Sequence, residues 1–583
     1  MLNIQLPHRA ACKNQGWRLI SSLQHISKRK FLSAESPYTS FHHKNGLEVR
    51  LPLIRTAFCK WLLRVVFFVL FSPALALAGS TGIQTATVKL YQQHCASCHG
   101  ANRLGGMGTA LLPENLSRLS QKRAIEEITN GEAITQMPGF GRKLSSQQIK
   151  GLVDYIYTPL ATEPVWGKAQ IDASRVVYYK PGSLGNKPVY QADPLNLFLV
   201  VELGDHHVTV LDGDKLVPIT RFKSRFALHG GPKYSPDGRF VYFASRGGWI
   251  SKYDMYNLKM LAEVRAGINT RNLAISGDGR YIMVGNYLPH TLVILDATDL
   301  SVLKIIPVTD KKHRKTSRVS AVYQAAPRHS FIVALKDLKE IWEISYADDA
   351  VAPQTKWIHD YRKDSGDEVP VKYERFPVRR IKIDTYMDDF MFDQKYRFLI
   401  GSSRGKDSQV RVIYLDGGVV AAKIDLPGMP HLGSGITWNY KGRQVMATPN
   451  LKQGIVSVID MKTWKVIKRI KTLGPGFFMR SHENTPYAWT DVFFGPNKDV
   501  MQVIDKRTLK IVKTLRPSPG KTSAHVEFDR YGRYALVSVW DMDGALVIYD
   551  AKTLKEIKRI PMKKPSGKYN VYNKIHRSAG TSH

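Results

Sequence analysis

A repeating unit of about 40–45 residues fills the chain from about residue 196 to its end. Each unit contains a strand of alternating apolar residues, a turn, a strand that ends on an acidic or turn residue, and a basic and apolar strand. The most regular units open on a Gly-Arg pair, as at Gly238-Arg239 and Gly279-Arg280. Eight units can be aligned, and they begin near Leu197, Gly238, Gly279, Ser330, Tyr396, Gly442, Tyr487 and Gly532.

Four short strands in each unit are typical of one blade of a β-propeller, which hides most of its strand edges by closing into a ring. The repeat therefore predicts an all-β, eight-bladed β-propeller over residues 196–583, with seven blades as the alternative. Residues 161–195 contain prolines and glycines, and we expect them to form the linker that precedes the propeller.

The first 78 residues have the features of an export signal. Residues 1–54 are polar and without pattern, and an upstream-extended gene start would explain them. Basic residues then lead into the apolar run Val65–Phe71, which small residues follow up to Ala78. This order is typical of a signal peptide over residues 55–78, and its apolar part is too short to span a membrane. We therefore expect a periplasmic protein that begins near Gly79 and has no stable membrane insertion.

Cleavage there changes the charge and the cysteine count. The formal net charge falls from +36 to +27, because residues 1–78 hold 11 Lys and Arg and two acids. The charge indicates an anionic partner, but nucleic acid is a poor candidate because the basic residues are spread over the repeats. Cys12 and Cys59 are removed, so Cys95 and Cys98 are the two cysteines that remain.

Those two cysteines lie in the sequence His94-Cys-Ala-Ser-Cys-His-Gly. Cys-x-x-Cys-His is the attachment motif of haem c, with Cys95 and Cys98 as the thioether residues and His99 as the proximal iron ligand. A thioredoxin-like dithiol or half of a zinc site does not explain His99, and no cysteine is left to complete a zinc site. The motif therefore predicts a covalent haem c.

The surroundings of the motif predict a small all-α cytochrome c domain over residues 79–160. Helices are expected over Thr87–His94 and over Ser145–Tyr157, where apolar residues recur at helical spacing. Met137 lies between them on a loop kept non-helical by the Pro and Gly that follow, and it is the candidate sixth iron ligand, with Met107 as the alternative. Ligation by His and Met suits electron transfer.

His and Arg residues recur at one phase of the repeat, about 7 to 11 residues ahead of the Gly-Arg pair or its equivalent. The residues at or near this phase are His229, Arg271, Arg318, His431, Arg480, His482 and His525. Because equivalent phases of a propeller share one face, we expect these side chains to converge on one mouth of the central axis. Imidazole binds iron and guanidinium binds carboxylates, so the set suits an iron tetrapyrrole with several carboxylates.

The haem c motif, the linker and the eight-bladed propeller together resemble the cytochrome cd1 family, whose propeller binds haem d1. The likeness covers about residues 85–583 and is carried by Ala227-Leu228-His229, Gly267–Arg271, Pro430–Gly435, Ser538-Val539-Trp540 and Gly567–Asn573. The resemblance implies that His229 is the proximal ligand of the propeller haem and that Arg246 and Arg271 hold its carboxylates. It also implies that His431 is a distal-pocket histidine.

Departures from the nitrite reductases of this family point to another branch. Those enzymes use two distal histidines, and Ala326 is expected at the position of the first, whereas His525 stands where they have a non-basic residue. The motif Leu473–Pro486 and the ending Gly580-Thr581-Ser582-His583 look like the dihydro-haem d1 dehydrogenase branch, which converts a propionate of dihydro-haem d1 into the acrylate of haem d1.

This resemblance implies an oxidoreductase, and we expect His229 and His431 to bind the iron of its substrate. Arg318 and Arg480 are expected around the macrocycle from their phase in the repeat. His525 is the expected base, with His482 second. Electrons would pass through haem c to a periplasmic acceptor, and a nitrite reductase could receive the product. The alternatives are a haem d1-dependent nitrite reductase and a non-catalytic haem d1 carrier or electron-transfer protein.

Overall fold

The computed structural model describes residues 85–117, 119–131, 137–162, 164–351, 373–403 and 409–577. The predicted extension over residues 1–54, the signal peptide over residues 55–78 and the ending Gly580–His583 lie outside these residues. Among the described residues, no helix is both long and apolar enough to cross a membrane.

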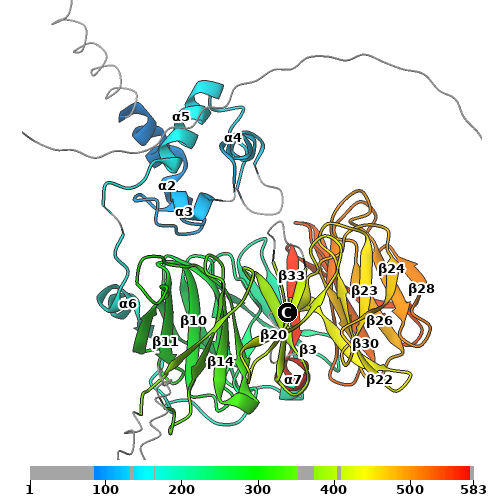
Figure 1. The fold of residues 1–583 in the computed structure, drawn as a ribbon. Coiled ribbons are helices and arrows are strands. Elements are labelled where there is room, and N and C mark those ends of the chain that lie inside the picture. The colour runs from blue at the N-terminus through cyan, green and yellow to red at the C-terminus, as the bar shows by residue number, and fades with distance from the viewer. Residues whose placement is uncertain are drawn as a thin grey trace, which may run out of the picture. The chain divides into compact units, whose positions relative to one another are not determined.

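The N-terminal part of the described chain is helical, as predicted (Figure 1). A helix over residues 85–94 is followed by α2 (Ala96–His99), α3 (Pro113–Leu116), α4 (Gln121–Asn130) and α5 (Ser146–Tyr157). One apolar core joins these helices, with Tyr91 from the first, Ile128 from α4 and Leu152 from α5.

Helix α5 forms where the sequence predicts it. Ser145 caps its first turn by accepting from the amide of Gln148, whose side chain accepts in return from the amide of Ser145. The residues that face the core are the four apolar residues of the predicted stripe, namely Ile149, Leu152, Val153 and Ile156.

From about residue 176 onward, the described residues form eight antiparallel sheets arranged in a ring, which confirms the predicted eight-bladed propeller (Figure 1). Blades 1 to 4, each from its innermost strand outward, are β33 (Pro565–Asn570), β2 (Leu197–Glu202), β3 (His207–Asp212) and β4 (Pro218–Lys223); β5 (Lys233–Tyr234), β6 (Phe240–Ala244), β7 (Trp249–Asp254) and β8 (Lys259–Arg265); β9 (Asn269–Ile275), β10 (Tyr281–Leu288), β11 (Thr291–Asp296) and β12 (Val302–Pro307); and β13 (Val319–Ala325), β14 (Ser330–Leu335), β15 (Glu340–Ser345) and β16 (Val378–Lys382). Blades 5 to 8 are β17 (Asp389–Phe392), β18 (Phe398–Ser402), β19 (Val410–Tyr414) and β20 (Val419–Ile424); β21 (Ile436–Tyr440), β22 (Arg443–Pro449), β23 (Ile455–Asp460) and β24 (Val466–Lys471); β25 (Met479–Ser481), β26 (Tyr487–Asp491), β27 (Met501–Asp505) and β28 (Lys510–Leu515); and β29 (Ser523–Phe528), β30 (Tyr534–Val539), β31 (Gly544–Asp550) and β32 (Glu556–Met562).

The first strands of neighbouring blades contact one another around the axis, as β9 does β13 and β25 does β29. Each aligned start of the sequence repeat falls at or just before the second strand of a blade. Apolar clusters lie between adjacent blades; one of them joins Met283 of β10 to Trp342 of β15, and both side chains are fully buried. The repeat therefore produces its core at the blade interfaces, where apolar faces of successive sheets meet.

Two segments add to the ring. The C-terminal strand β33 pairs with β2, so the last strand in sequence completes the first blade. In the predicted linker, α6 (Lys168–Ser174) buries Ile171 in the core shared by blades 2 and 3, and β1 (Val176–Val177) extends blade 2 by pairing with β8. The predicted linker therefore contains ordered elements that pack against the propeller.

Candidate functional site

In the Cys-x-x-Cys-His motif, one nitrogen of the His99 imidazole is left available to bind iron. His99 Nδ1 donates to the carbonyl oxygen of Thr109 at 2.7 Å, so the lone pair of Nε2 remains for iron. Burial lowers the pKa of His99, which keeps the ring neutral as a ligand must be. A Cβ at Gly108 would lie 2.6 Å from the His99 ring, so only glycine fits there. With the free thiols of Cys95 and Cys98 beside it, this arrangement fits covalent haem c.

Met137 packs against the helical core that Cys95 also contacts. Within the described residues, Met107 is not part of that cluster. Met137 follows α4 closely, where Phe140 N–H donates to the carbonyl of Ile128 and holds the loop against the helix. The packing favours Met137 over Met107 as the sixth ligand, which stays a prediction.

Five of the predicted propeller residues line one cavity of about 440 Å³. His229 precedes β5, Arg246 follows β6, Arg271 lies in β9, His431 precedes β21 and His525 lies in β29. These positions lie at the same end of the innermost strands, so the ring brings together side chains that are far apart in sequence. The cavity therefore contains three imidazoles and two guanidinium groups.

His229 is oriented by its neighbours. Nδ1 donates to the carbonyl of Arg271 at 2.8 Å, and Nε2 accepts from Arg246 Nη2 at 3.0 Å and from Arg271 Nη1 at 2.9 Å. Burial lowers the pKa of His229 well below its ordinary value, and the charges of Arg246 and Arg271 lower it further. The imidazole is therefore neutral, with its Nε2 lone pair directed at cations, which is the form that binds iron.

His431 has a similar arrangement. Nδ1 donates to the carbonyl of Phe477 at 2.5 Å, which leaves the lone pair on Nε2. The Asp389 carboxylate lies 3.9 Å from Nε2, and the ring of Phe477 lies 4.3 Å from the imidazole, centroid to centroid. His431 can therefore bind a metal or accept a proton through Nε2.

His525 has an unusual backbone for a strand residue, with φ of 54°, at a register shift between β29 and β30. Such left-handed geometry is costly for a residue with a Cβ and is often found at functional sites. The side chain is 2% exposed and packs edge-on against Phe478 at 4.7 Å. Burial, followed by the charges of Lys568 and Arg480, lowers the pKa of His525 well below its ordinary value.

A buried carboxylate holds the wall next to His525. Asp491 accepts from the amides of Phe477 at 2.7 Å, Phe478 at 3.1 Å and His525 at 3.4 Å. Burial raises the pKa of Asp491 to about 7, against the opposing effects of these amides and of Lys568. Asp491 therefore ties the aromatic loop ahead of β25 to the bulged strand β29.

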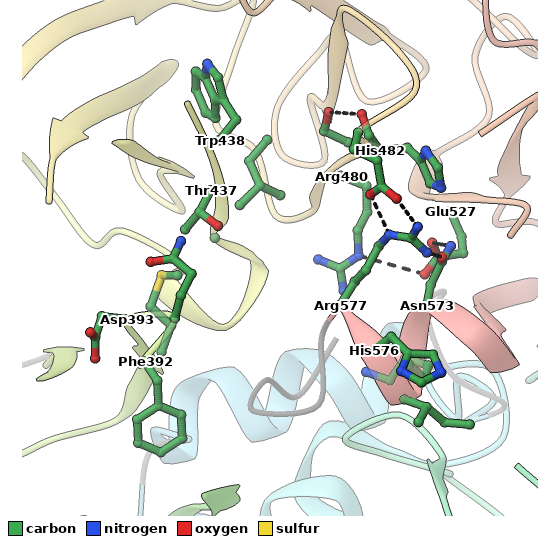
Figure 2. Close-up of a pocket in the computed structure, with 18 of the residues that line it drawn as sticks. Phe392, Asp393, Thr437, Trp438, Arg480, His482, Glu527, Asn573, His576 and Arg577 are labelled. Carbon is green, nitrogen blue, oxygen red and sulfur yellow. Dashed lines mark hydrogen bonds and ion pairs between the residues drawn. The ribbon is translucent and has the colours of Figure 1, made fainter. Parts of the chain in front are cut away.

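Three predicted residues are not brought to this cavity. Arg480 and His482 line a different cavity, shown in Figure 2. Arg480 is the middle residue of β25, and His482 follows its last residue and donates through Nε2 to the carbonyl of Arg530, 3.1 Å away. Arg318 is not a lining residue, but it precedes β13 at the same end as His229, pairs with Asp337 at 2.6 Å and lies 5.8 Å from the ring of the lining residue Tyr287. The innermost strands run from one face to the other, so residues late in β25 leave the predicted mouth.

Ala326 is also placed elsewhere. It begins the short 3₁₀ helix η2 (Ala326–Arg328), which follows β13 and lines the same cavity as His482. The expectation that Ala326 occupies a distal histidine position is therefore corrected, because it lies at the opposite end of the innermost strand from His229 and His431.

Several lining residues were not predicted as functional. Tyr287, at the end of β10, lies with its ring centroid 5.6 Å from the Arg246 guanidinium and 5.8 Å from the Lys336 ammonium. Lys336 forms an ion pair with Asp388 at the cavity wall. No His or Arg marks these positions, so the search for recurring basic residues missed them. Phe477, Phe478, Trp540 and Tyr569 also line the cavity and lie in the sequence motifs quoted above.

These residues fit an iron tetrapyrrole that carries carboxylates. Two imidazoles, those of His229 and His431, present Nε2 lone pairs, and Arg246 and Arg271 supply guanidinium donors. Aromatic rings cover part of the wall.

The comparisons agree with this geometry. The family model described as "Cytochrome D1 heme domain" matches residues 192–373 and 350–574, and "Cytochrome C oxidase, cbb3-type, subunit III" matches residues 84–156. The chain is 55% identical over 514 residues to the "Dihydro-heme d1 dehydrogenase" of Pseudomonas aeruginosa, covering 88% of this chain and 97% of that protein. It is 23% identical to a "Nitrite reductase" of Stutzerimonas stutzeri, covering 84% of this chain and 92% of that protein.

A solved structure described as "Dihydro-heme d1 dehydrogenase NirN in complex with DHE" matches with a TM-score of 0.74 and 56% identity. The match covers 84% of this chain and 99% of the other. The family model covers more than half of the chain and the Pseudomonas relative is matched over nearly its whole length, so this chain belongs to the cytochrome D1 heme domain family.

Proposed function

We propose that this protein is a dihydro-haem d1 dehydrogenase, which converts a propionate side chain of dihydro-haem d1 into the acrylate of haem d1. The observation that carries the proposal is the convergence of His229, His431, His525 and two arginines on one cavity, in a chain so similar to a protein of that name. A neutral, buried histidine beside arginines is suited to an iron macrocycle with carboxylates.

In this proposal His229 and His431 would hold the substrate iron through their Nε2 atoms. Arg246 and Arg271, which donate to His229 in this structure, turn to the substrate carboxylates when the iron takes that lone pair. The carboxylates then replace a hydrogen-bond acceptor that the arginines lose.

The reaction removes two hydrogens from adjacent carbons, which amounts to two electrons and two protons. Cys95, Cys98 and His99 would hold haem c, which would supply one-electron transfer to an external acceptor. The protons leave to a base and then to solvent. The carbon–carbon single bond of the propionate side chain becomes a double bond that is conjugated with its carboxylate.

His525 is the proposed base, because burial keeps it neutral at ordinary pH. The amide of Lys568 donates to Nδ1 at 3.4 Å, so neutral His525 has its hydrogen on Nε2. Accepting a proton at Nε2 requires the other tautomer, which sacrifices this long hydrogen bond at about 1 kcal/mol. His482 is no longer a candidate for this role, because it lines the other cavity.

The test is chromatographic identification of the tetrapyrrole before and after incubation of the haem c-loaded protein with dihydro-haem d1 and an oxidant. We expect the acrylate product, with two electrons transferred per product formed. His525→Ala should bind the substrate and lose turnover by about 10²–10⁴-fold. Full turnover by this variant would refute the role of His525, and rapid nitrite reduction with no acrylate product would refute the function.

We further propose that the protein works in the periplasm, with a periplasmic electron acceptor and, as receiver of the product, a nitrite reductase. Support comes from the apolar segment over residues 55–78 and from the Cys-x-x-Cys-His motif. Fractionation of cells with an antibody against the propeller tests the compartment.

A further inference from the structure

A second cavity, of about 1350 Å³, lies at the other end of the innermost strands (Figure 2). Its lining comes from the turns between the first and second strands of the blades and from α7 (Val571–His576). The His229 cavity is instead lined at the opposite ends of those strands. The proposed dehydrogenation assigns no role to this second cavity.

Three cations line its inner part although they are almost fully buried. Lys233 is 7% exposed, Arg480 is 8% exposed and Lys574 is 5% exposed. Burying a charge costs several kcal/mol unless opposite charges or hydrogen bonds compensate for it. Three such groups in one place therefore require an explanation.

Two of these cations have polar atoms without a hydrogen-bond partner among the described residues, namely Arg480 Nη2 and Lys574 Nζ. Arg480 Nη1 donates to the carbonyl of Met479 at 3.1 Å, so one edge of the guanidinium is used and the other is not. Lys574 Nζ lies 5.8 Å from the ring centroid of Tyr569, a contact that provides no acceptor atom.

One carboxylate lies among them. Glu527 is 3.9 Å from Arg480 Nε and also accepts from Asn573 Nδ2 at 3.3 Å. Figure 2 shows Arg480, Glu527 and Asn573 together on one wall of the cavity. Lys233 Nζ donates to the carbonyl of Gly230 at 2.8 Å and burial lowers its pKa to about 7, so the excess of positive charge over Glu527 comes mainly from Arg480 and Lys574.

Three outer cations of the cavity are already engaged. Arg577 pairs with Glu483, an ion pair drawn in Figure 2, and Arg507 pairs with Asp505 at 2.6 Å. Lys506 donates to the carbonyl of His482 at 2.9 Å. Arg480 and Lys574, whose donors lack acceptors among the described residues, are instead buried, where a ligand would also be best protected from water.

Loss of a proton relieves only part of this excess. Burial lowers the pKa of Lys574 well below its ordinary value, and Lys233 and Arg480 lower it further. Arg480 stays charged at any ordinary pH, because a guanidinium does not release its proton in proteins. A neutral Lys574 would still leave the Nη2 donor of Arg480 without an acceptor.

We propose that this cavity binds a small oxyanion that carries two or more negative charges, held by Arg480 Nη2 and Lys574 Nζ and favoured by the charge of Lys233. Phosphate and small di- or tricarboxylates share this chemistry, since both offer oxygens to a guanidinium and an ammonium. The site is separate from the His229 cavity and does not depend on the reaction that occurs there.

The test is titration calorimetry of the full-length, haem c-loaded protein with inorganic phosphate and with citrate, each against chloride and acetate at equal ionic strength. We expect saturable binding of the multivalent anions alone, and the tighter of the two identifies the anion class. Lys574→Met should weaken that binding at least tenfold. Lys441→Met, which removes an exposed cation from the rim of the same cavity, should change it less than threefold.

A second measurement does not depend on any variant. Bound anion should slow hydrogen exchange in α7 of the wild-type protein, whereas chloride at the same ionic strength should not. Absence of saturable binding by both phosphate and citrate overturns the proposal. Equal weakening in Lys574→Met and Lys441→Met overturns it as well, because a general charge effect would then explain the binding.

Discussion

Replacement of Asp491 by asparagine should change how stability depends on pH. Burial raises the pKa of this carboxyl from 3.8 to about 7. Between these values the folded protein keeps a proton on Asp491 that the unfolded chain releases, so stability falls as the pH rises through this window. Each pH unit of difference is worth about 1.36 kcal/mol, which gives a loss of about 4 kcal/mol by pH 7 and above.

Asparagine has no proton to release, so this contribution disappears in Asp491→Asn. The single side-chain oxygen of asparagine can replace Oδ1, which accepts from Phe477 and Phe478, but then the amide of His525 loses its acceptor Oδ2, at a cost that does not depend on pH. The free energy of unfolding of the variant, relative to wild type, should therefore rise by about 4 kcal/mol between pH 4 and pH 8. Urea unfolding followed by tryptophan fluorescence across this range measures it.

Asp499 provides a control of opposite sign. Although burial opposes the effect, the amide of Gly520 and the Arg516 guanidinium hold the pKa of Asp499 below its ordinary value. The stability that Asp499 contributes is therefore present above its unfolded pKa and lost as the pH falls. Asp499→Asn should differ least from wild type at low pH. If Asp491→Asn gave a difference that is constant with pH, or one shaped like that of Asp499→Asn, the reasoning about Asp491 would be wrong.

Three further predictions concern the haem sites and the ring. His229→Ala should abolish tetrapyrrole binding, measured by absorbance titration, while haem c absorbance stays unchanged, and Arg246→Met should weaken binding about tenfold, or about 1.4 kcal/mol; unchanged affinity in both would contradict the assignment of the cavity. Met137→Ala should alter the haem c spectrum and lower its reduction potential, whereas Met107→Ala should do neither, and the reverse result would make Met107 the ligand. Deletion of residues 565–577 should make the propeller sensitive to protease at low concentration, and resistance equal to wild type would show that the ring closes without β33.

The sequence predicted the eight blades because the repeat itself is the blade, and each aligned start falls at or just before a second strand. It predicted the height of a side chain along the axis less well, because the innermost strands differ in length. β5 has two residues, β25 has three and β9 has seven, so counting back from the outer turn reaches different depths in different blades. His229 and Arg271 were placed correctly on one mouth, whereas Arg480 and His482 were not.

The unpredicted part of the site depends on contacts between blades. Tyr287 and Asp388 belong to different blades, and neither residue type is unusual near a strand end. The role of Asp491 was also missed: it ends β26, a second strand, whereas the acidic residues that recur in the repeat, such as Asp254 and Asp505, end third strands. Only the packed structure shows that the Asp491 carboxylate accepts hydrogen bonds from backbone amides of two blades.

The pairing of β33 with β2 determines the order in which the two domains can complete folding during synthesis. β2 is buried along its whole length, and until β33 arrives it is an edge strand with unpaired amides and carbonyls. The ring therefore cannot finish folding before the end of the chain has been made, while the helical domain, held by local contacts, can already fold around Cys95. Because Gly567 and Tyr569 of β33 also line the His229 cavity, a chain that lacks β33 lacks part of the wall that would hold the macrocycle.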